Sequence, residues 1–401
     1  MRIILLGLAR LVPALGAILL NLFVARTFPL IVADIFFIWF AIFYAASFIT
    51  KLGFDVFLLR EVAAETIKAA GTYKRWVFSA SFLMTVALFQ FATSDVIWLL
   101  FGLPFFSVAA LNSSITRAQG KDVTSGLLEV SSISAVSFIL LLILNYFSTS
   151  ISLEIVCQSF FAACLIVFFV GEYLSGYKNT IFTAGEYISN SILLAALSLA
   201  ISPFVIYCTQ WVAVFFLKFG PVGEVSLYSV GVRLASAFAF VTITVDAFVA
   251  PRFARLLRKG AVDEVNTLIR QVRNKASWLM IFALSFYAAV GWYIAKEYLS
   301  QQYIDSLKVS IIIAFYYLSV IIIGPYQYLL LMAGKAKIVN YSNGLVAVLV
   351  LVSSVTAMAF DLTSAVLFAC FVTISRIIGM LFIRRSATLL LADDLLAAHR
   401  A

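Results

Sequence analysis

Apolar stretches long enough to cross a bilayer, about 20 residues each, alternate with shorter polar segments along the whole chain. The pattern predicts six membrane-spanning helices in the first half of the chain and six in the second. The expected fold is therefore an all-α polytopic membrane protein with about twelve transmembrane helices. The predicted spans are 3–24, 31–50, 76–93, 95–115, 123–147, 151–171, 190–217, 225–250, 276–296, 308–332, 338–360 and 363–383.

Three of the remaining segments mix apolar and charged residues at helical spacing, namely 54–71, 253–274 and the tail 386–401. Such segments form amphipathic helices at the inner membrane surface or serve as solvated connectors, and the pattern leaves both options open for each. The loops on the opposite side are very short, as at 219–224 and 361–363. We therefore expect no extracytoplasmic domain.

Composition agrees with a membrane protein. Of 401 residues, 64% are hydrophobic and 12% are charged, whereas soluble domains carry about 25% charged residues. The mean hydropathy is +1.07. The net charge of +9 comes from basic residues scattered between apolar stretches, so it predicts no nucleic-acid partner.

The basic residues predict the orientation instead, because Lys and Arg accumulate in cytoplasmic loops. Twenty-one Lys and Arg residues fall in the loops of one side and four in the loops of the other, with three more inside predicted spans. We therefore expect both termini in the cytoplasm.

The two halves of the chain resemble each other. The matched positions are Pro13 with Pro203, Asp55 with Asp246, Arg60 with Arg252, and the run 118–121 with the run 332–335. A parallel repeat of six helices implies two bundles with a cavity between them, which is a transporter architecture. The expected divisions are an N-terminal six-helix bundle at 1–185, a C-terminal six-helix bundle at 186–385 and a cytoplasmic amphipathic tail at 386–401.

Three arginines lie deep inside predicted spans: Arg10, Arg233 and Arg376. An arginine at the centre of a membrane helix costs about 2.5–3.5 kcal/mol on insertion scales, so such residues usually face a watery cavity and mark a substrate path. A guanidinium binds phosphate oxygens through two parallel hydrogen bonds, which favours an anionic substrate headgroup. The alternatives are snorkelling to the membrane surface or a carbonyl or carboxylate partner within the bundle.

Four uncharged amides also fall inside predicted spans: Asn21, Asn112, Gln210 and Gln327. Amides beside aromatic rings suit sugar hydroxyls, so these residues are candidate substrate-binding groups. Interhelical hydrogen bonding is the competing use.

Three carboxylates near helix ends are candidates for coupling to a proton or sodium gradient: Asp34, Asp246 and Glu129. Carboxylates at these positions are also often simply solvated.

Catalytic and cofactor-binding motifs are missing from the sequence. The only histidine is His399, near the C-terminal end, and the four cysteines lie in apolar stretches, which predicts neither a metal site nor histidine chemistry. The sequence contains no Walker motif and no catalytic cluster. We therefore expect a transporter that is not an enzyme and holds no cofactor.

The pattern resembles the polysaccharide and O-antigen flippases of the multidrug, oligosaccharidyl-lipid and polysaccharide exporter superfamily. The resemblance covers the whole chain. It rests on twelve spans in about 400 residues, on Gly53 to Glu61 after the second span, on the Gly-Lys run at 118–121 and on Tyr228 to Arg233 in the eighth span.

The resemblance implies a flippase that moves an undecaprenyl-pyrophosphate-linked oligosaccharide across the bacterial inner membrane by alternating access. Arg10, Arg233 and Arg376 would be the cations that meet the headgroup. The implied partners are the lipid-linked oligosaccharide and membrane lipids, with a polysaccharide polymerase and a chain-length regulator as further candidates.

Two other functions compete with the flippase. A multidrug or small-solute antiporter of the same architecture would show carboxylates deep in its cavity. A polymerase or lipid-dependent glycosyltransferase would need a long outward loop, and the outward loops here are short.

Overall fold

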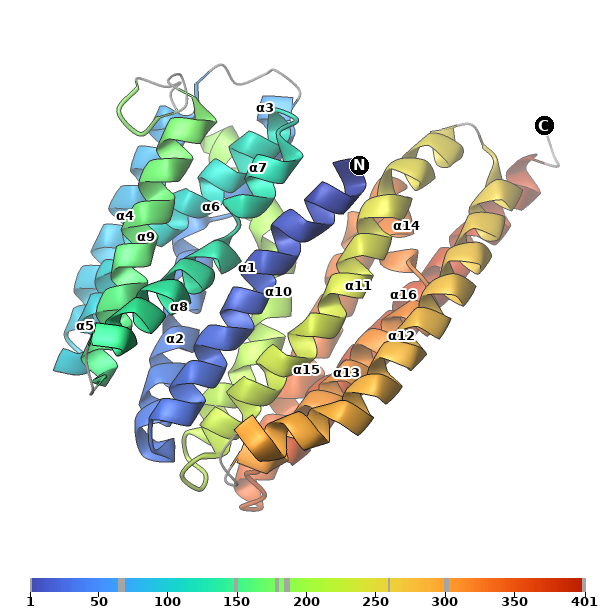
Figure 1. Ribbon diagram of the computed structural model, residues 1–401. Coiled ribbons are helices and arrows are strands. Elements are labelled where there is room, and N and C mark those ends of the chain that lie inside the picture. Colours follow the sequence, from blue (N-terminus) through green and yellow to red (C-terminus); the bar gives the residue numbers. More distant parts are fainter. Residues whose placement is uncertain are drawn as a thin grey trace. The chain divides into compact units, whose positions relative to one another are not determined.

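The structure is a computed structural model that describes residues 2–63, 69–147, 151–176, 180–183, 188–258, 260–298 and 303–398. The described residues are almost entirely helical (Figure 1). The chain separates into two compact units, Met1–Phe204 and Val205–Ala401. The boundary between them lies inside helix α10, beyond the division expected between residues 185 and 186.

The elements that precede α10 are α1 (Arg2–Thr27), α2 (Leu30–Lys51), α3 (Phe54–Ala63), α4 (Gly71–Phe89), η1 (Ser94–Val96), α5 (Ile97–Phe101), α6 (Leu103–Ala118), α7 (Asp122–Leu127), α8 (Val130–Phe147) and α9 (Leu153–Ser175). The remaining elements are α10 (Asn190–Leu217), α11 (Glu224–Arg258), α12 (Val262–Tyr298), α13 (Ile304–Ile323), α14 (Tyr326–Met332), α15 (Ala336–Ala359) and α16 (Ala365–Ala398).

Each predicted span coincides with one helix or with consecutive short helices. Within the described residues, nine helical segments are long and apolar enough to cross a membrane. The predicted class, an all-α polytopic membrane protein, is confirmed, whereas the count of twelve spans and the orientation stay predictions.

Three predicted spans are interrupted. The span 308–332 divides into α13 and α14 at Gly324 and Pro325. Gly324 has a φ of +114°, which a glycine adopts readily, and proline has no N–H with which to continue a helix. The span 123–147 divides into α7 and α8, and the span 95–115 divides into η1, α5 and α6.

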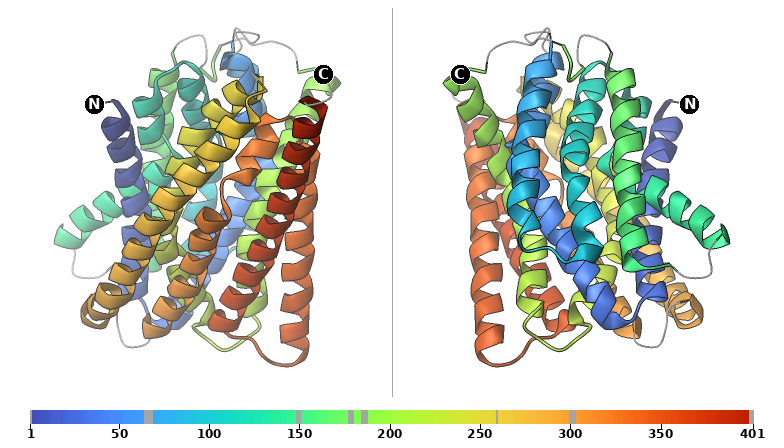
Figure 2. Two further views of the ribbon diagram at one scale, coloured as in Figure 1. Left: turned by 90° about the vertical axis from the view of Figure 1, so that its right-hand side faces the viewer. Right: turned by 90° about the vertical axis from the view of Figure 1, so that its left-hand side faces the viewer.

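The two units share a pattern of helix packing. In the first unit α8 packs against α9, α6 against α9, and α4 against α6; in the second α15 packs against α16, α13 against α16, and α12 against α13. Figure 2 shows that α8 lies obliquely to α9. The corresponding helix pairs support the internal repeat seen in the sequence.

The two Gly-Lys turns also have the same local geometry. Gly120 and Gly334 have φ of +75° and +73°. In each turn the N–H of the following lysine, Lys121 or Lys335, donates to the carbonyl five residues earlier, at 3.1 Å and 2.9 Å. This is the pattern of a Schellman helix end, so the matched sequence run ends a helix in the same way in both units.

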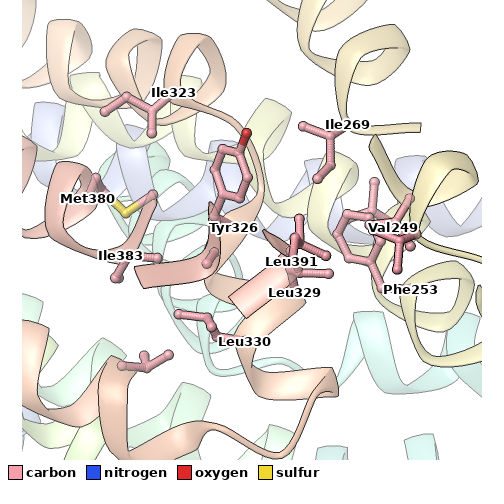
Figure 3. Close-up of a cluster of buried hydrophobic side chains, with 14 residues drawn as sticks. Val249, Phe253, Ile269, Ile323, Tyr326, Leu329, Leu330, Met380, Ile383 and Leu391 are labelled. Carbon is pink, nitrogen blue, oxygen red and sulfur yellow. The ribbon is translucent and has the colours of Figure 1, made fainter. Parts of the chain in front are cut away.

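Segment 253–274 is helical on both sides of a turn. It contains the end of α11, a turn at Gly260 and the start of α12. Both helix ends pack into an apolar cluster with α14 and α16 (Figure 3). Labelled members of the cluster include Phe253, Ile269, Leu329 and Ile383.

The expected amphipathic segment 54–71 contains α3, which packs against α4 and α6 within the first unit. Phe54, Phe57 and Leu58 of α3 are buried in a cluster that includes Tyr73 of α4. The helix starts after Gly53, where an added Cβ would lie 2.3 Å from a backbone oxygen. The tail expected from residue 386 starts within α16, which is continuous to Ala398; residues 399–401, including His399, lie outside the described residues.

Helices α1 and α8 approach closely at a glycine. A Cβ added to Gly16 would lie 2.4 Å from the Cα of Ala135 and 2.2 Å from its Cβ. Small residues allow such close backbone contact between membrane helices, where dispersion contacts drive association. The α1–α8 contact therefore depends on the absence of a side chain at residue 16.

Replacing Gly16 with leucine is expected to destabilise the first unit by at least the ~1–3 kcal/mol typical of overpacking, because the contacting atoms include backbone. Thermal unfolding of the detergent-purified protein measures this loss. Gly344→Leu in α15 is the matched control, since an added Cβ at that position meets nothing within 4 Å. Equal unfolding temperatures for the two variants would contradict the close packing.

Candidate functional site

Arg376 lies inside the second unit on α16 and is 8% exposed. Its Nη2 donates hydrogen bonds to the carbonyl of Ile206 and to Thr209 Oγ1 on α10, both at 3.3 Å. The guanidinium also lies over the ring of Tyr316 on α13, 5.0 Å from the ring centroid. Among the described residues, no carboxylate lies within 4.0 Å of this guanidinium.

A small cavity of about 40 Å³ lies beside Arg376. Both hydrogen bonds from Arg376 to described residues use Nη2. The cavity brings together one guanidinium, two amides and three hydroxyl groups. The polar residues that line it are Thr209, Tyr316, Gln327, Ser342, Asn343 and Arg376.

Arg233 on α11 is a second arginine inside the same unit. It is half-buried, and its guanidinium lies 5.2 Å from the centroid of the Trp211 ring. Trp211 stacks on Tyr207 at 5.9 Å. Arg233 and Arg376 therefore each lie over an aromatic ring of the second unit.

Two other predicted residues are placed only as backbone. Arg10 lies in α1 and Gln210 lies in α10, but their side chains lie outside the part of the chain that the structure describes. Their roles as substrate-binding residues stay predictions.

The two predicted amides of the first unit are buried. Asn21 Nδ2 donates to the carbonyl of Ala17 at 2.6 Å, one turn earlier in α1. Asn112 Nδ2 donates to Glu172 Oε1 at 3.1 Å. Asn112 therefore makes an interhelical hydrogen bond, the alternative use of an amide in a membrane, whereas the bond of Asn21 lies within its own helix.

The three predicted carboxylates lie in different surroundings. Glu129 follows α7 and pairs with Arg117, with 2.8 Å between Oε1 and Nη2. Asp34 is half-buried in α2. Asp246 lines a small cavity of the second unit that Arg273 also lines. Their coupling roles stay predictions.

Sequence patterns missed several of these residues. Ser342 and Asn343 lie in a polar run inside the predicted span 338–360. Such a run inside an apolar span could have indicated a polar site at this position. Lys74 and Glu172 form a buried ion pair, but each falls just outside a predicted span, where charged residues normally face water. Only the packing of the helices shows that they are buried.

Metal binding has no support in the described residues, which contain no group of three or more His, Cys, Asp or Glu side chains that could hold an ion. The arrangement is instead suited to a polar anionic ligand. The apolar helices of the two units define a multi-pass membrane protein.

Known structures share this fold. Neither protein-family models nor curated protein sequences match the chain. A MOP superfamily transporter from Pyrococcus furiosus aligns with a TM-score of 0.70 at 11% identity, over 98% of this chain and 94% of that chain. The lipid II flippase MurJ, in an inward closed conformation, aligns with a TM-score of 0.72 at 13% identity, over 96% of this chain and 87% of that chain.

A multidrug resistance MATE family transporter of the MOP superfamily, in an outward-facing conformation, aligns with a TM-score of 0.67 at 12% identity, over 97% of this chain and 96% of that chain. At these identities the similarity concerns the fold. The chain has the fold of MOP superfamily transporters.

Proposed function

We propose that this protein is a flippase that moves an undecaprenyl-pyrophosphate-linked oligosaccharide, the repeat unit of O-antigen or a related surface polysaccharide, across the bacterial inner membrane. The observation that carries the proposal is the pair of arginines in the second unit. Arg376 has no carboxylate partner among the described residues, and the guanidinium of Arg233 lies over the Trp211 ring in the same unit.

Two guanidinium groups suit a pyrophosphate, which carries more than one negative charge. Each planar guanidinium offers parallel donors to phosphate oxygens and keeps its charge at every physiological pH. Tyr316 and Trp211 each cover one guanidinium face, which holds it in place. Gln327 and Asn343 in the adjoining cavity offer amide groups to the hydroxyls of a sugar.

In the proposed cycle the two units alternate between inward-open and outward-open arrangements. The pyrophosphate binds the arginines, with Arg10 as a third candidate, and the sugars cross in the polar interior while the lipid tail stays in the bilayer. Both termini are cytoplasmic. A proton or sodium gradient drives the cycle through Asp34, Asp246 or Glu129, and a polymerase and a chain-length regulator receive the product.

A multidrug or small-solute antiporter is the second candidate. MATE family transporters share the fold, and Asp246 lines a cavity of the second unit, as a carboxylate that exchanges ions would. The buried guanidinium of Arg376 favours an anionic substrate over a cationic drug, because like charges repel strongly at low dielectric constant.

Deletion of the gene is expected to trap lipid-linked oligosaccharide in the inner leaflet. The trapped fraction is measured in spheroplasts as lipid-linked sugar that an added glycosidase cannot reach, and a plasmid copy of the wild-type gene should restore access. If deletion leaves the glycosidase-accessible fraction unchanged but increases sensitivity to cationic drugs, the antiporter function is supported and the flippase function is contradicted.

A further inference from the structure

A cleft of about 600 Å³ opens on the second unit where the end of α11 meets the start of α12. Its volume falls within the range of about 300–1,000 Å³ that ligand-binding sites of proteins have. The cavity beside Arg376, at about 40 Å³, has room for only a few water molecules. Most of an oligosaccharide that reached Arg376 would therefore lie outside that cavity, and the cleft is large enough to receive part of it.

Both helices contribute polar side chains to the cleft. The lining residues are Arg252 and Leu256 from α11 and Asp263, Glu264, Thr267, Leu268 and Gln271 from α12. Those of α12 recur every four residues, as in the series Asp263, Thr267 and Gln271, so they lie on one face of that helix. All the polar lining residues are exposed, so a ligand in the cleft can reach them.

The opposite face of α12 holds the cleft in shape. Val265 and Ile269 are buried in the apolar cluster of Figure 3, together with Phe253 at the end of α11. The same cluster includes residues of α14 and α16. The polar groups of the cleft are therefore mounted on packed helices, which position binding groups more precisely than loops do.

The lining groups suit sugar hydroxyls, each of which both donates and accepts hydrogen bonds. The two carboxylates accept such bonds, the guanidinium of Arg252 donates them, and the amide of Gln271 does both. The bonds to the charged groups are the stronger ones. The two leucines offer apolar surface to the C–H groups of a sugar ring.

The charges of the cleft favour a sugar over a pyrophosphate. The described lining residues carry two negative charges and one positive charge, so a pyrophosphate in the cleft would meet both carboxylates. At Arg376 the described residues place no carboxylate within 4.0 Å. An uncharged sugar therefore fits the cleft, and an anionic headgroup fits the surroundings of Arg376.

We propose that the cleft is a second binding site, separate from the cavity beside Arg376, and that it binds uncharged sugars. Arg252, Asp263 and Gln271 bind sugar hydroxyls there. That these sugars belong to a lipid-linked substrate rests on the proposed function. In the expected orientation, segment 253–274 lies on the cytoplasmic side, from which the proposed substrate starts.

The test measures binding of a lipid-free oligosaccharide to the full-length protein in detergent. The probe is the repeat-unit oligosaccharide released by mild acid from the lipid fraction of cells that carry the gene. Titration followed by saturation-transfer NMR gives its Kd. Gln271→Leu should raise the Kd about fivefold and Asp263→Asn about tenfold or more, as expected for the loss of a neutral and of a charge-assisted hydrogen bond.

The matched control is Asn266→Leu, which also replaces an exposed amide of α12 with leucine but at a position that does not line the cleft. Its Kd should equal that of the wild type. Substitutions of exposed side chains such as these rarely change stability. A wild-type Kd in both Gln271→Leu and Asp263→Asn would overturn the sugar site, as would equal weakening by Gln271→Leu and Asn266→Leu.

The same variants are then compared in flipping of lipid-linked oligosaccharide by liposomes. Gln271→Leu should raise KM and leave kcat unchanged, since it removes binding that the substrate keeps throughout the reaction. An unchanged KM would overturn a role of the cleft in transport.

Binding requires neither lipid nor transport, so the site and the proposed function can fail separately. A wild-type protein that binds the oligosaccharide through the cleft but does not flip the lipid-linked form refutes the flippase and supports the site. A wild-type protein that does not bind the oligosaccharide refutes the site. If that protein instead binds ethidium, a cationic drug, and Asp263→Asn weakens this binding, the cleft serves the antiporter and the sugar site is overturned.

Discussion

Arg376→Ala is expected to lower transport of lipid-linked oligosaccharide roughly 10- to 150-fold, the equivalent of one charge-assisted hydrogen bond of about 1.5–3 kcal/mol. The reason is that Arg376 is buried and lines the polar cavity of the second unit. Complementation of a flippase-deficient strain, scored as surface polysaccharide at matched membrane abundance, measures the loss.

Two further variants make the Arg376 test specific. Arg376→Lys keeps the charge but loses the planar fork, so transport should fall between that of the wild type and that of Arg376→Ala. Arg384→Ala removes an exposed arginine from the same helix and should leave transport unchanged. If a normally inserted Arg376→Ala protein transports as well as Arg384→Ala, then Arg376 only stabilises the bundle through Ile206 and Thr209.

Lys74→Met is expected to destabilise the first unit by about 3–5 kcal/mol, because it leaves the buried carboxylate of Glu172 without its cation. Lys74 is fully buried and Glu172 is nearly so, hence solvent cannot replace the lost partner. Thermal unfolding of the purified protein, followed by size-exclusion chromatography, measures the change, and poor recovery from the membrane is the expected cellular counterpart.

The second change, Glu172→Leu, should restore most of the stability lost in Lys74→Met. Recovery should be incomplete, since the amide of Asn112 and the N–H of Ile181 lose the acceptor that Glu172 provides. A double variant no more stable than the single one would contradict this interpretation and would indicate that Lys74 stabilises the unit through its aliphatic stem or through Ser175.

Apolar runs were enough to predict where the helices lie, because a bilayer demands apolar side chains and internally paired backbone groups over a known length. The interruption at Gly324 and Pro325 also has a signal in the sequence. The packing of segment 253–274 into the apolar cluster of Figure 3 has a weaker signal, since the residues that enter the cluster have the spacing of any amphipathic helix.

The sites were less predictable than the helices. Arg376 and Gln327 were singled out from their depth within predicted spans, and the fold places both at one cavity. The bond between Glu172 and Ile181 had no sequence signal, because it depends on a backbone N–H in a loop. Lys74 falls in the predicted loop just before the span 76–93, and its position in the sequence does not show that α6 and α9 cover it.

Flipping by the purified protein in liposomes tests the central claim most directly. The substrate is a polyprenyl-pyrophosphate oligosaccharide with a fluorescent sugar, and a membrane-impermeant quencher is added outside. With wild-type protein, quenching should extend beyond the outer-leaflet fraction, and Arg376→Ala should slow this second phase while Arg384→Ala does not. Quenching that stops at the outer-leaflet fraction for correctly folded wild-type protein, under an imposed proton or sodium gradient as well, would contradict the proposed function.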